Sequence, residues 1–310
     1  MTRISVVMTV YNSAATLVET MESILGQTES DFELIVVDDG SNDATLRMLA
    51  RYDDARVRIL RNAGNIGLTR SLIAGCAAAR GMCIARHDAG DRSHPDRFRK
   101  QWRLLDNDPR LALVSCATEF VGPNSEYLFT SRPAGIALRP IEMLDPAATN
   151  GIVAGPSHHG SAMFRRDAYE RAGGYRAEWY YGQDWDLWYR IGAEGLFQSI
   201  DEPLYVARVT PDSISGSARE AQQELAKLSH AALMARARGE SDAEIVSAAS
   251  RIRKTPPPGR AARARGLYFI GEALRRNSDR RARGYLGAAI RTDPLQWRAW
   301  LRYAQTVAMR

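Results

Sequence analysis

Strand-like and helical segments alternate four times within about the first 90 residues of this chain. The expected strands cover 4–10, 34–37, 57–60 and 83–85, and the expected helices cover 17–25, 43–52 and 68–79, with Ser13 as the N-cap of the first helix. Strands separated by helices in this way form a mostly parallel sheet with helices on its faces. Such a sheet binds ligands outside the carboxyl ends of its strands, so the polar residues that follow the strands are the candidates for function.

The pattern becomes less regular beyond Pro95 and turns entirely helical near residue 217. We expect strands at 111–121, 161–164 and 204–209, helices around 98–105 and at 184–191, and a loop-rich stretch over 122–157. The clearest linker lies near 255–259, where three prolines precede a glycine. The sequence therefore predicts an α/β domain over 1–215 and a helical, Arg-rich extension over 216–310. Residues 282–304 resemble one tetratricopeptide-like helix pair, which cannot bury its own face and should pack on the main domain or on a partner.

The extension differs sharply in charge from the rest of the chain. Residues 251–310 hold 15 Lys/Arg and 3 Asp/Glu, whereas residues 1–250 hold 27 and 33. This asymmetry fits an anionic partner, either a membrane leaflet or a polyanionic acceptor, or a solvated helical surface. No nucleic-acid-binding motif is present, so we expect no nucleic-acid partner. The lack of a long apolar run or a signal peptide, together with three scattered cysteines, predicts a cytoplasmic protein, peripheral at the inner face of a membrane if the basic helices contact it.

Acidic residues follow two of the expected strands. Asp38 and Asp39 end the second strand, and Asp88 and Asp91 follow the fourth. Carboxylate oxygens there suit Mg²⁺ or Mn²⁺ shared with a diphosphate. The alternative for the first pair is a helix cap and turn. The chain has neither a glycine-rich dinucleotide motif after its first strand nor a GxxxxGK[ST] loop, so a nucleotide would be held by side chains and a metal.

An ordered series of motifs over about residues 3–210 resembles the family 2 glycosyltransferases. The motifs are SVVMTVYN at 5–12, SILGQT at 23–28, FELIVVDDGS at 32–41, NIG at 65–67 with Arg70, the acidic cluster, PDR at 95–97, HGSAMFRR at 159–166, GGY at 173–175 and QDWDLWYR at 183–190. This resemblance implies an inverting enzyme with the GT-A fold, a Rossmann-like, mostly parallel sheet flanked by helices. It implies a nucleoside-diphosphate sugar as donor, with UDP favoured.

The resemblance also implies roles for particular residues. Asp88 and Asp91 would bind the sugar diphosphate through a divalent metal, and Asp184 would be the general base that deprotonates the acceptor hydroxyl. Contacts to the nucleotide sugar would come from Thr9, Tyr11, Asp38, Asp39, Arg70 and Asp88. Two positions depart from the family pattern. Gly90 replaces a common metal-binding Asp, which leaves the dependence on Mg²⁺ or Mn²⁺ open, and Gln183 replaces the Glu before the base.

The acceptor side is less defined by the sequence. His159 and Trp179 are candidates for contact with the acceptor or a phosphate, and the alternative for each is a structural role. We expect the acceptor to be a growing cell-surface glycan or its lipid-linked precursor. Two other hypotheses remain open: a non-catalytic scaffold that binds nucleotide sugars or glycans, and a nucleotidyltransferase, which would need a basic loop that residues 11–20 lack.

Overall fold

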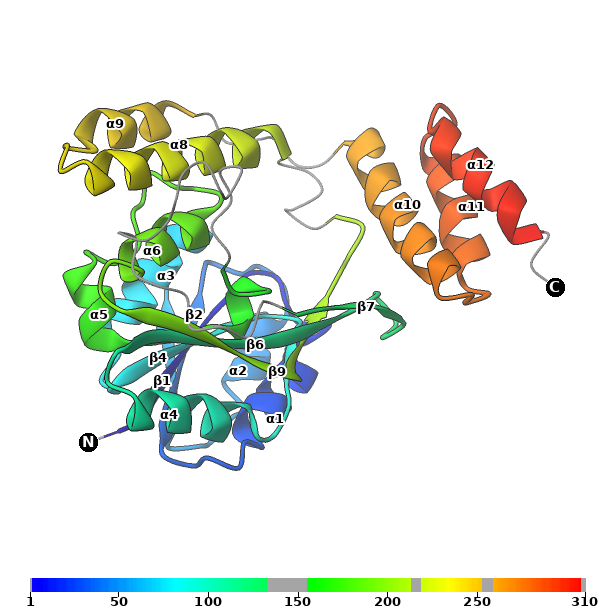
Figure 1. Ribbon diagram of the computed structural model, residues 1–310. Helices are drawn as coiled ribbons and strands as arrows, with labels where there is room; N and C mark the ends of the chain where they lie inside the picture. The colour runs from blue at the N-terminus through cyan, green and yellow to red at the C-terminus, as the bar shows by residue number, and fades with distance from the viewer. Residues whose placement is uncertain (1, 133–154, 213–218, 253–258, 308–310) are drawn as a thin grey trace. The chain divides into compact units, whose positions relative to one another are not determined.

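A computed structural model of the chain describes residues 2–132, 155–212, 219–252 and 259–307 (Figure 1). The chain forms two compact units built from non-contiguous segments. Unit 1 comprises residues 1–118, 131–207 and 225–252. Unit 2 comprises residues 119–130, 208–224 and 253–310. Each unit contains segments from before and after residue 215. The predicted division into a domain over 1–215 and an extension over 216–310 stays a prediction.

A nine-stranded sheet runs in the order β3-β2-β1-β4-β8-β6-β9-β5, with β7 paired to β6. Strands β1 to β4 are parallel to one another, and the short strand β8 pairs antiparallel with both β4 and β6. The strands are β1 (Ile4–Val10), β2 (Phe32–Asp38), β3 (Val57–Arg61), β4 (Cys83–Asp88), β5 (Arg92–Ser93), β6 (Leu111–Val121), β7 (Tyr127–Ser131), β8 (Met163–Arg165) and β9 (Leu196–Arg208).

Helices cover both faces of this sheet and make three layers (Figure 1). The α-helices of unit 1 before residue 207 are α1 (Leu17–Leu25), α2 (Thr45–Leu49), α3 (Leu68–Ala77), α4 (Arg97–Asn107), α5 (Arg166–Arg171) and α6 (Gln183–Ile191). Val6 and Met8 of β1 pack with residues of α1, α2 and α4, whereas Val7 packs with α3, α5 and α6. Both faces of β1 are buried, as its continuous apolar run requires. The predicted α/β fold with a mostly parallel sheet is confirmed.

Several boundaries differ from the prediction for local reasons. Helix α1 begins at Leu17 after Thr16. The Ser13 carbonyl accepts hydrogen bonds from the N–H groups of Thr16 and Leu17, so Ser13 begins a turn and Thr16 is the N-cap. Strand β4 extends to Asp88, and β9 begins already at Leu196. Within the loop-rich stretch 122–157, β7 is formed, and residues 133–154 lie outside the described residues.

The remaining helices are α8 (Arg219–Ala237), α9 (Ala243–Arg251), α10 (Arg260–Arg276), α11 (Ala282–Thr292) and α12 (Trp297–Val307). In unit 2, α10 and α11 pack against the tip of the β6–β7 hairpin. Leu128 of β7 lies in one apolar cluster with Ile270 and Leu274 of α10, and the Tyr285 hydroxyl donates to Glu126 at 2.7 Å. The hairpin thus covers apolar surface that the helices cannot bury alone. No described helix is long and apolar enough to cross a membrane.

Candidate functional site

The acidic cluster forms a tight turn at the carboxyl end of β4. Asp88 is the last residue of the strand, and its carbonyl accepts the Asp91 N–H at 3.2 Å. Gly90 lies between them with φ +96°, a conformation that L residues rarely adopt. The glycine that replaces the family's usual acid is therefore part of the turn that brings the Asp88 and Asp91 carboxylates together.

Tyr205 of β9 ties the two acids to each other. Its hydroxyl accepts the Asp88 N–H at 3.0 Å and donates to Asp91 Oδ2 at 2.8 Å. The ring is fully buried, and the guanidinium of Arg97 lies 4.8 Å from its centre. A Cβ at Gly160 would lie 2.0 Å from this hydroxyl, so the absence of a side chain there makes room for Tyr205.

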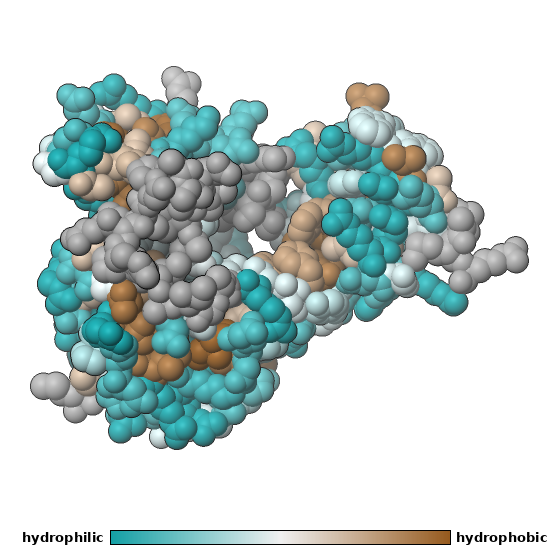
Figure 2. All heavy atoms as spheres, in the orientation of Figure 1, coloured by the Kyte–Doolittle hydropathy of each residue, from teal (hydrophilic) through white to brown (hydrophobic). Residues whose placement is uncertain are grey.

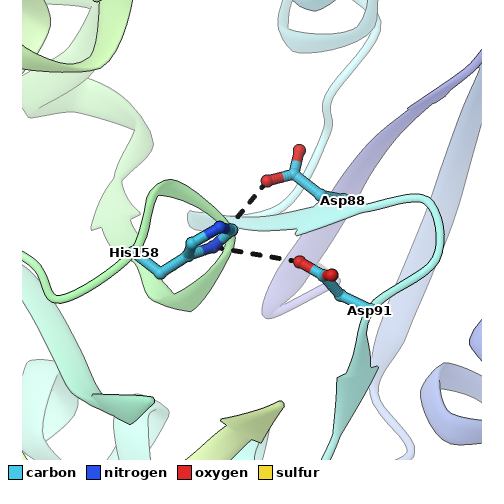
Figure 3. A group of neighbouring side chains, drawn as sticks. All are labelled: Asp88, Asp91 and His158. Atoms are coloured by element: carbon cyan, nitrogen blue, oxygen red, sulfur yellow. Dashed lines mark ion pairs between the residues drawn. The ribbon is translucent and has the colours of Figure 1, made fainter. Parts of the chain in front are cut away.

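His158 completes a group of three potential metal ligands (Figure 3). Its Nδ1 lies 3.9 Å from Asp88 Oδ2 and 3.9 Å from Asp91 Oδ2, and one donor atom from each residue falls within 4.8 Å of the others. Burial lowers the pKa of His158, which favours the neutral imidazole that binds metals. In this structure Nδ1 accepts the Gly160 N–H at 3.0 Å, a bond that a metal on Nδ1 would displace. Two carboxylates and one imidazole fit a divalent cation.

Arg86 lies beneath this cluster, fully buried on β4. Its guanidinium donates to Asp88 Oδ1, to the carbonyl of Val7 at 2.7 Å and to His159 Nε2 at 3.2 Å. Burial by itself would raise the pKa of Asp88, but the charge of Arg86 holds it well below its usual range. Asp88 is therefore ionised and ready to bind a cation.

His159 connects the cluster to the helical layer. Its Nε2 is 2.7 Å from the Tyr175 hydroxyl, and its ring meets the edge of Trp188 on α6 at 6.1 Å between centroids. Burial keeps its pKa well below the usual value, so the ring is neutral and can accept the Arg86 hydrogen bond. These contacts position α6 relative to Arg86. A contact from His159 to acceptor or phosphate stays a prediction.

Asp184 lies in the first turn of α6, after Gly182, whose φ is +64°. Burial raises the pKa of Asp184 to about 6, against the effect of hydrogen bonds from its own N–H and that of Trp185. The negative charge of the Asp88 carboxylate also contributes to raising this pKa. A carboxyl group that titrates near 6 can accept a proton at neutral pH. By contrast, Asp186 is fully buried and accepts a hydrogen bond from Arg190 Nε at 3.1 Å, a structural ion pair.

The predicted nucleotide residues gather at the neighbouring strand ends. In the sheet register, Thr9 pairs with Asp88 of β4, and the next residue, Val10, pairs with Asp38 of β2. Tyr11 follows β1 and is 46% exposed, which leaves its ring accessible. The structure thus brings Thr9, Tyr11, Asp38 and Asp88 to one edge of the sheet.

Asp38 and Asp39 have different environments. The Asp39 carboxylate accepts hydrogen bonds from Asn62 Nδ2 at 2.8 Å and from the N–H groups of Ile66 and Gly67 at 2.9 Å, and so holds the loop before α3. Asp38 Oδ2 is buried and has no hydrogen-bond partner among the residues that the structure describes. Arg70 is exposed on the first turn of α3, directly after the loop that Asp39 holds.

Trp179 lies away from any accessible surface. Its ring is fully buried, its Nε1 donates to Ser229 Oγ on α8 at 2.7 Å, and its carbonyl accepts the Thr69 hydroxyl at 2.8 Å. These contacts tie α3 to α8 within unit 1. The next residue, Tyr180, packs on Gly67, where a Cβ would lie 2.6 Å from its ring.

Sequence comparisons identify related proteins. The profile of the family described as Glycosyl transferase family 2 matches residues 5–173. EpsE of Bacillus subtilis (strain 168) is 34% identical over 220 residues, which cover 68% of this chain and 74% of that protein. The succinoglycan biosynthesis protein ExoO of Rhizobium meliloti (strain 1021) is 42% identical over 103 residues, 33% of this chain and 30% of ExoO.

Solved structures show the same fold. The crystal structure of S. aureus TarS 1–349 in complex with UDP aligns with a TM-score of 0.58 and 16% identity over 98% of this chain and 88% of that one. The corresponding complex with UDP-GlcNAc aligns with a TM-score of 0.58 and 15% identity over 94% of this chain and 81% of that one. At this level of identity the likeness concerns the fold alone.

Proposed function

The chain belongs to glycosyl transferase family 2, and we propose that it transfers a sugar from a nucleoside-diphosphate sugar to an acceptor hydroxyl with inversion at the anomeric carbon. The observation that carries this proposal is the pairing of two kinds of acid, since contacts from Trp188 through His159 and Arg86 link helix α6, which bears Asp184, to the Asp88 cluster. Asp88 is held ionised beside Asp91 and His158, whereas Asp184 has a pKa raised to about 6. The first site suits a cation, which would stabilise the departing diphosphate, and the second suits the proton that an inverting transfer removes from the acceptor.

The donor would bind along the carboxyl edge of β1, β2 and β4. Tyr11 offers an exposed ring for the base. Asp38 Oδ2 has no hydrogen-bond partner among the described residues and suits an N–H or hydroxyl donor of the nucleoside. Asp88, Asp91 and His158 would hold a divalent cation, which, when bound, offsets the negative charge of the departing diphosphate. The TarS complexes hold UDP and UDP-GlcNAc, and we infer a uridine nucleotide for this chain as well.

The acceptor reaction would depend on Asp184. As the acceptor hydroxyl attacks C1 of the sugar from the face opposite the diphosphate, the Asp184 carboxylate takes its proton. Tyr175, His159 and Trp188 hold α6 against the buried Arg86, so the base and the cation site keep a fixed relation. ExoO is a succinoglycan biosynthesis protein, which supports a cell-surface glycan or its precursor as the acceptor. We expect the reaction to take place in the cytoplasm.

A donor-hydrolysis panel tests this function. Purified protein is incubated with UDP-, dTDP- and GDP-sugars with Mn²⁺ or with chelator, and released nucleoside diphosphate is measured. We expect slow release from a UDP-sugar with Mn²⁺, and loss of release in Asp184→Asn with UDP binding retained. Binding of a nucleotide sugar without any turnover, even with candidate glycan acceptors, would favour the non-catalytic scaffold instead.

A further inference from the structure

Helix α12 in unit 2 is attached to its neighbours through a small face. Ala299 is fully buried, and with Tyr303 it packs against Leu267 of α10 and Ile290 of α11. Arg302, at the edge of this face, lies 3.4 Å from Glu272 Oε2. These residues recur three and four positions apart, so one side of α12 is fixed to α10 and α11.

The opposite side of α12 is apolar and exposed. Trp297, Trp300 and Leu301 share that side, and they are 65%, 53% and 50% exposed. Leu295, just before the helix, is 88% exposed. The outer side of a helix on a globular unit is ordinarily polar. Single exposed apolar residues need no explanation, but four large ones within seven positions mark a contact surface.

The surroundings of this apolar side are strongly basic. Residues 251–310 carry 15 Lys/Arg against 3 Asp/Glu, and hydrophilic residues predominate on the face of unit 2 that Figure 2 shows. Arg291 and Arg298 are exposed, and the Arg298 guanidinium lies 5.5 Å from the centre of the Trp297 ring. This charge opposes contact with a second copy of the same unit, because like charges would face each other across the interface.

We propose that α12 is a membrane-interface helix, which lies in the plane of an anionic leaflet. Trp297, Trp300, Leu301 and Leu295 would enter the headgroup region, and Arg291 and Arg298 would contact lipid phosphates. Tryptophan and arginine next to each other suit this boundary, because the indole is amphipathic and the guanidinium pairs with phosphate. This inference goes beyond the proposed transfer and does not depend on it.

Vesicle flotation with the full-length protein tests the proposal. We expect the protein to float with phosphatidylcholine vesicles that contain phosphatidylglycerol, and to stay at the bottom with pure phosphatidylcholine or at high salt. Trp297→Ala combined with Trp300→Ala should lower the bound fraction roughly tenfold or more, and Arg298→Gln should lower it about fivefold. Alanine preserves the helix and both indoles are more than half exposed, so the fold should be retained although the Trp300 Nε1 hydrogen bond to the Pro294 carbonyl is lost.

Phe269→Ala is the matched control, because Phe269 is an exposed aromatic residue (47%) on α10 of the same unit. We expect its flotation to equal that of the wild type. The proposal would be overturned if wild-type flotation did not depend on phosphatidylglycerol, or if the double tryptophan variant floated as well as the wild type. So would a wild-type dimer in light scattering that the tryptophan variant converts to a monomer, since a second copy would then cover α12.

Discussion

The pH dependence of turnover follows from the environment of Asp184. With a pKa of about 6, the carboxylate is mostly ionised at pH 7 and mostly protonated at pH 5. A base must be ionised to accept a proton, so kcat/KM for UDP release should fall about tenfold between pH 7 and pH 5. An ordinary aspartate, with its pKa near 3.8, would lose only about 6% of its ionised form over that range.

Asp184→Asn removes the base but keeps the shape of the side chain. We expect turnover at pH 7 to fall about 10²- to 10⁴-fold, with UDP affinity unchanged in calorimetry. The matched control is Asp167→Asn, which changes the corresponding first-turn acid of α5 on the surface and should retain wild-type turnover. Full activity of Asp184→Asn, or a flat profile between pH 5 and 7, would refute the assignment of Asp184 as base.

The same variant has a stability readout. Because burial raises the folded-state pKa of Asp184 above the unfolded value of 3.8, its ionised form costs stability above pH 6, and this cost disappears as the pH falls from 6 towards 4. At pH 8, Asp184→Asn should therefore raise the free energy of unfolding by at most ~3 kcal/mol, and with it Tm. At pH 4 the substitution should change Tm little. A lower Tm at pH 8 would show that Asp184 is stabilising, as a helix N-terminal acid would be.

Three further predictions concern the cation and nucleotide sites. His158→Ala should weaken Mn²⁺ binding about tenfold or more in calorimetry, with a smaller effect on Mg²⁺, and an unchanged Mn²⁺ affinity would remove His158 from the ligand set. Gly160→Ala should displace the Tyr205 hydroxyl, destabilise the protein by about 1–3 kcal/mol and weaken Mn²⁺ binding, whereas Gly284→Ala, whose Cβ meets open space, should leave both unchanged. Asp38→Asn should weaken UDP binding without lowering Tm, because its buried Oδ2 has no partner in the described part of the chain. Asp39→Asn should lower Tm, because an NH2 group in place of Oδ2 can no longer accept the Gly67 N–H. Equal effects of the two variants on both measurements would contradict this distinction.

The parallel half of the sheet could be predicted because its strands alternate with helical segments, β1 and β2 contain continuous apolar runs, and β2 and β4 end in acids. Those acids also indicated where a ligand would bind. Strand β9 was less visible, since its first half, Leu196–Asp201, mixes polar and apolar residues that become ordered only by pairing in the sheet. Ser13 has the right chemistry for an N-cap, but the turn that follows it places Thr16 at that position.

The supporting residues of the site depend on tertiary structure. Arg86 follows the apolar run 83–85, where a charged residue is unexpected from the sequence. Its buried hydrogen bonds to Asp88 and His159 account for a charge at this position. His158 and His159 are neighbours with the same chemistry, and His159 was the predicted site residue. The 3₁₀ turn His159–Ser161 gives the two side chains different directions. His158, just before the turn, faces Asp88 and Asp91, whereas His159 faces Arg86 and Tyr175.

Calorimetric titration of UDP into the protein, with and without Mn²⁺, tests the account most directly. The site built by Asp88, Asp91 and His158 predicts that UDP binds, that Mn²⁺ tightens the binding, and that Asp88→Asn removes the effect of Mn²⁺. If UDP does not bind under either condition, or binds equally well in the wild type and in Asp88→Asn with Mn²⁺, then the cluster does not hold a cation against a nucleotide diphosphate.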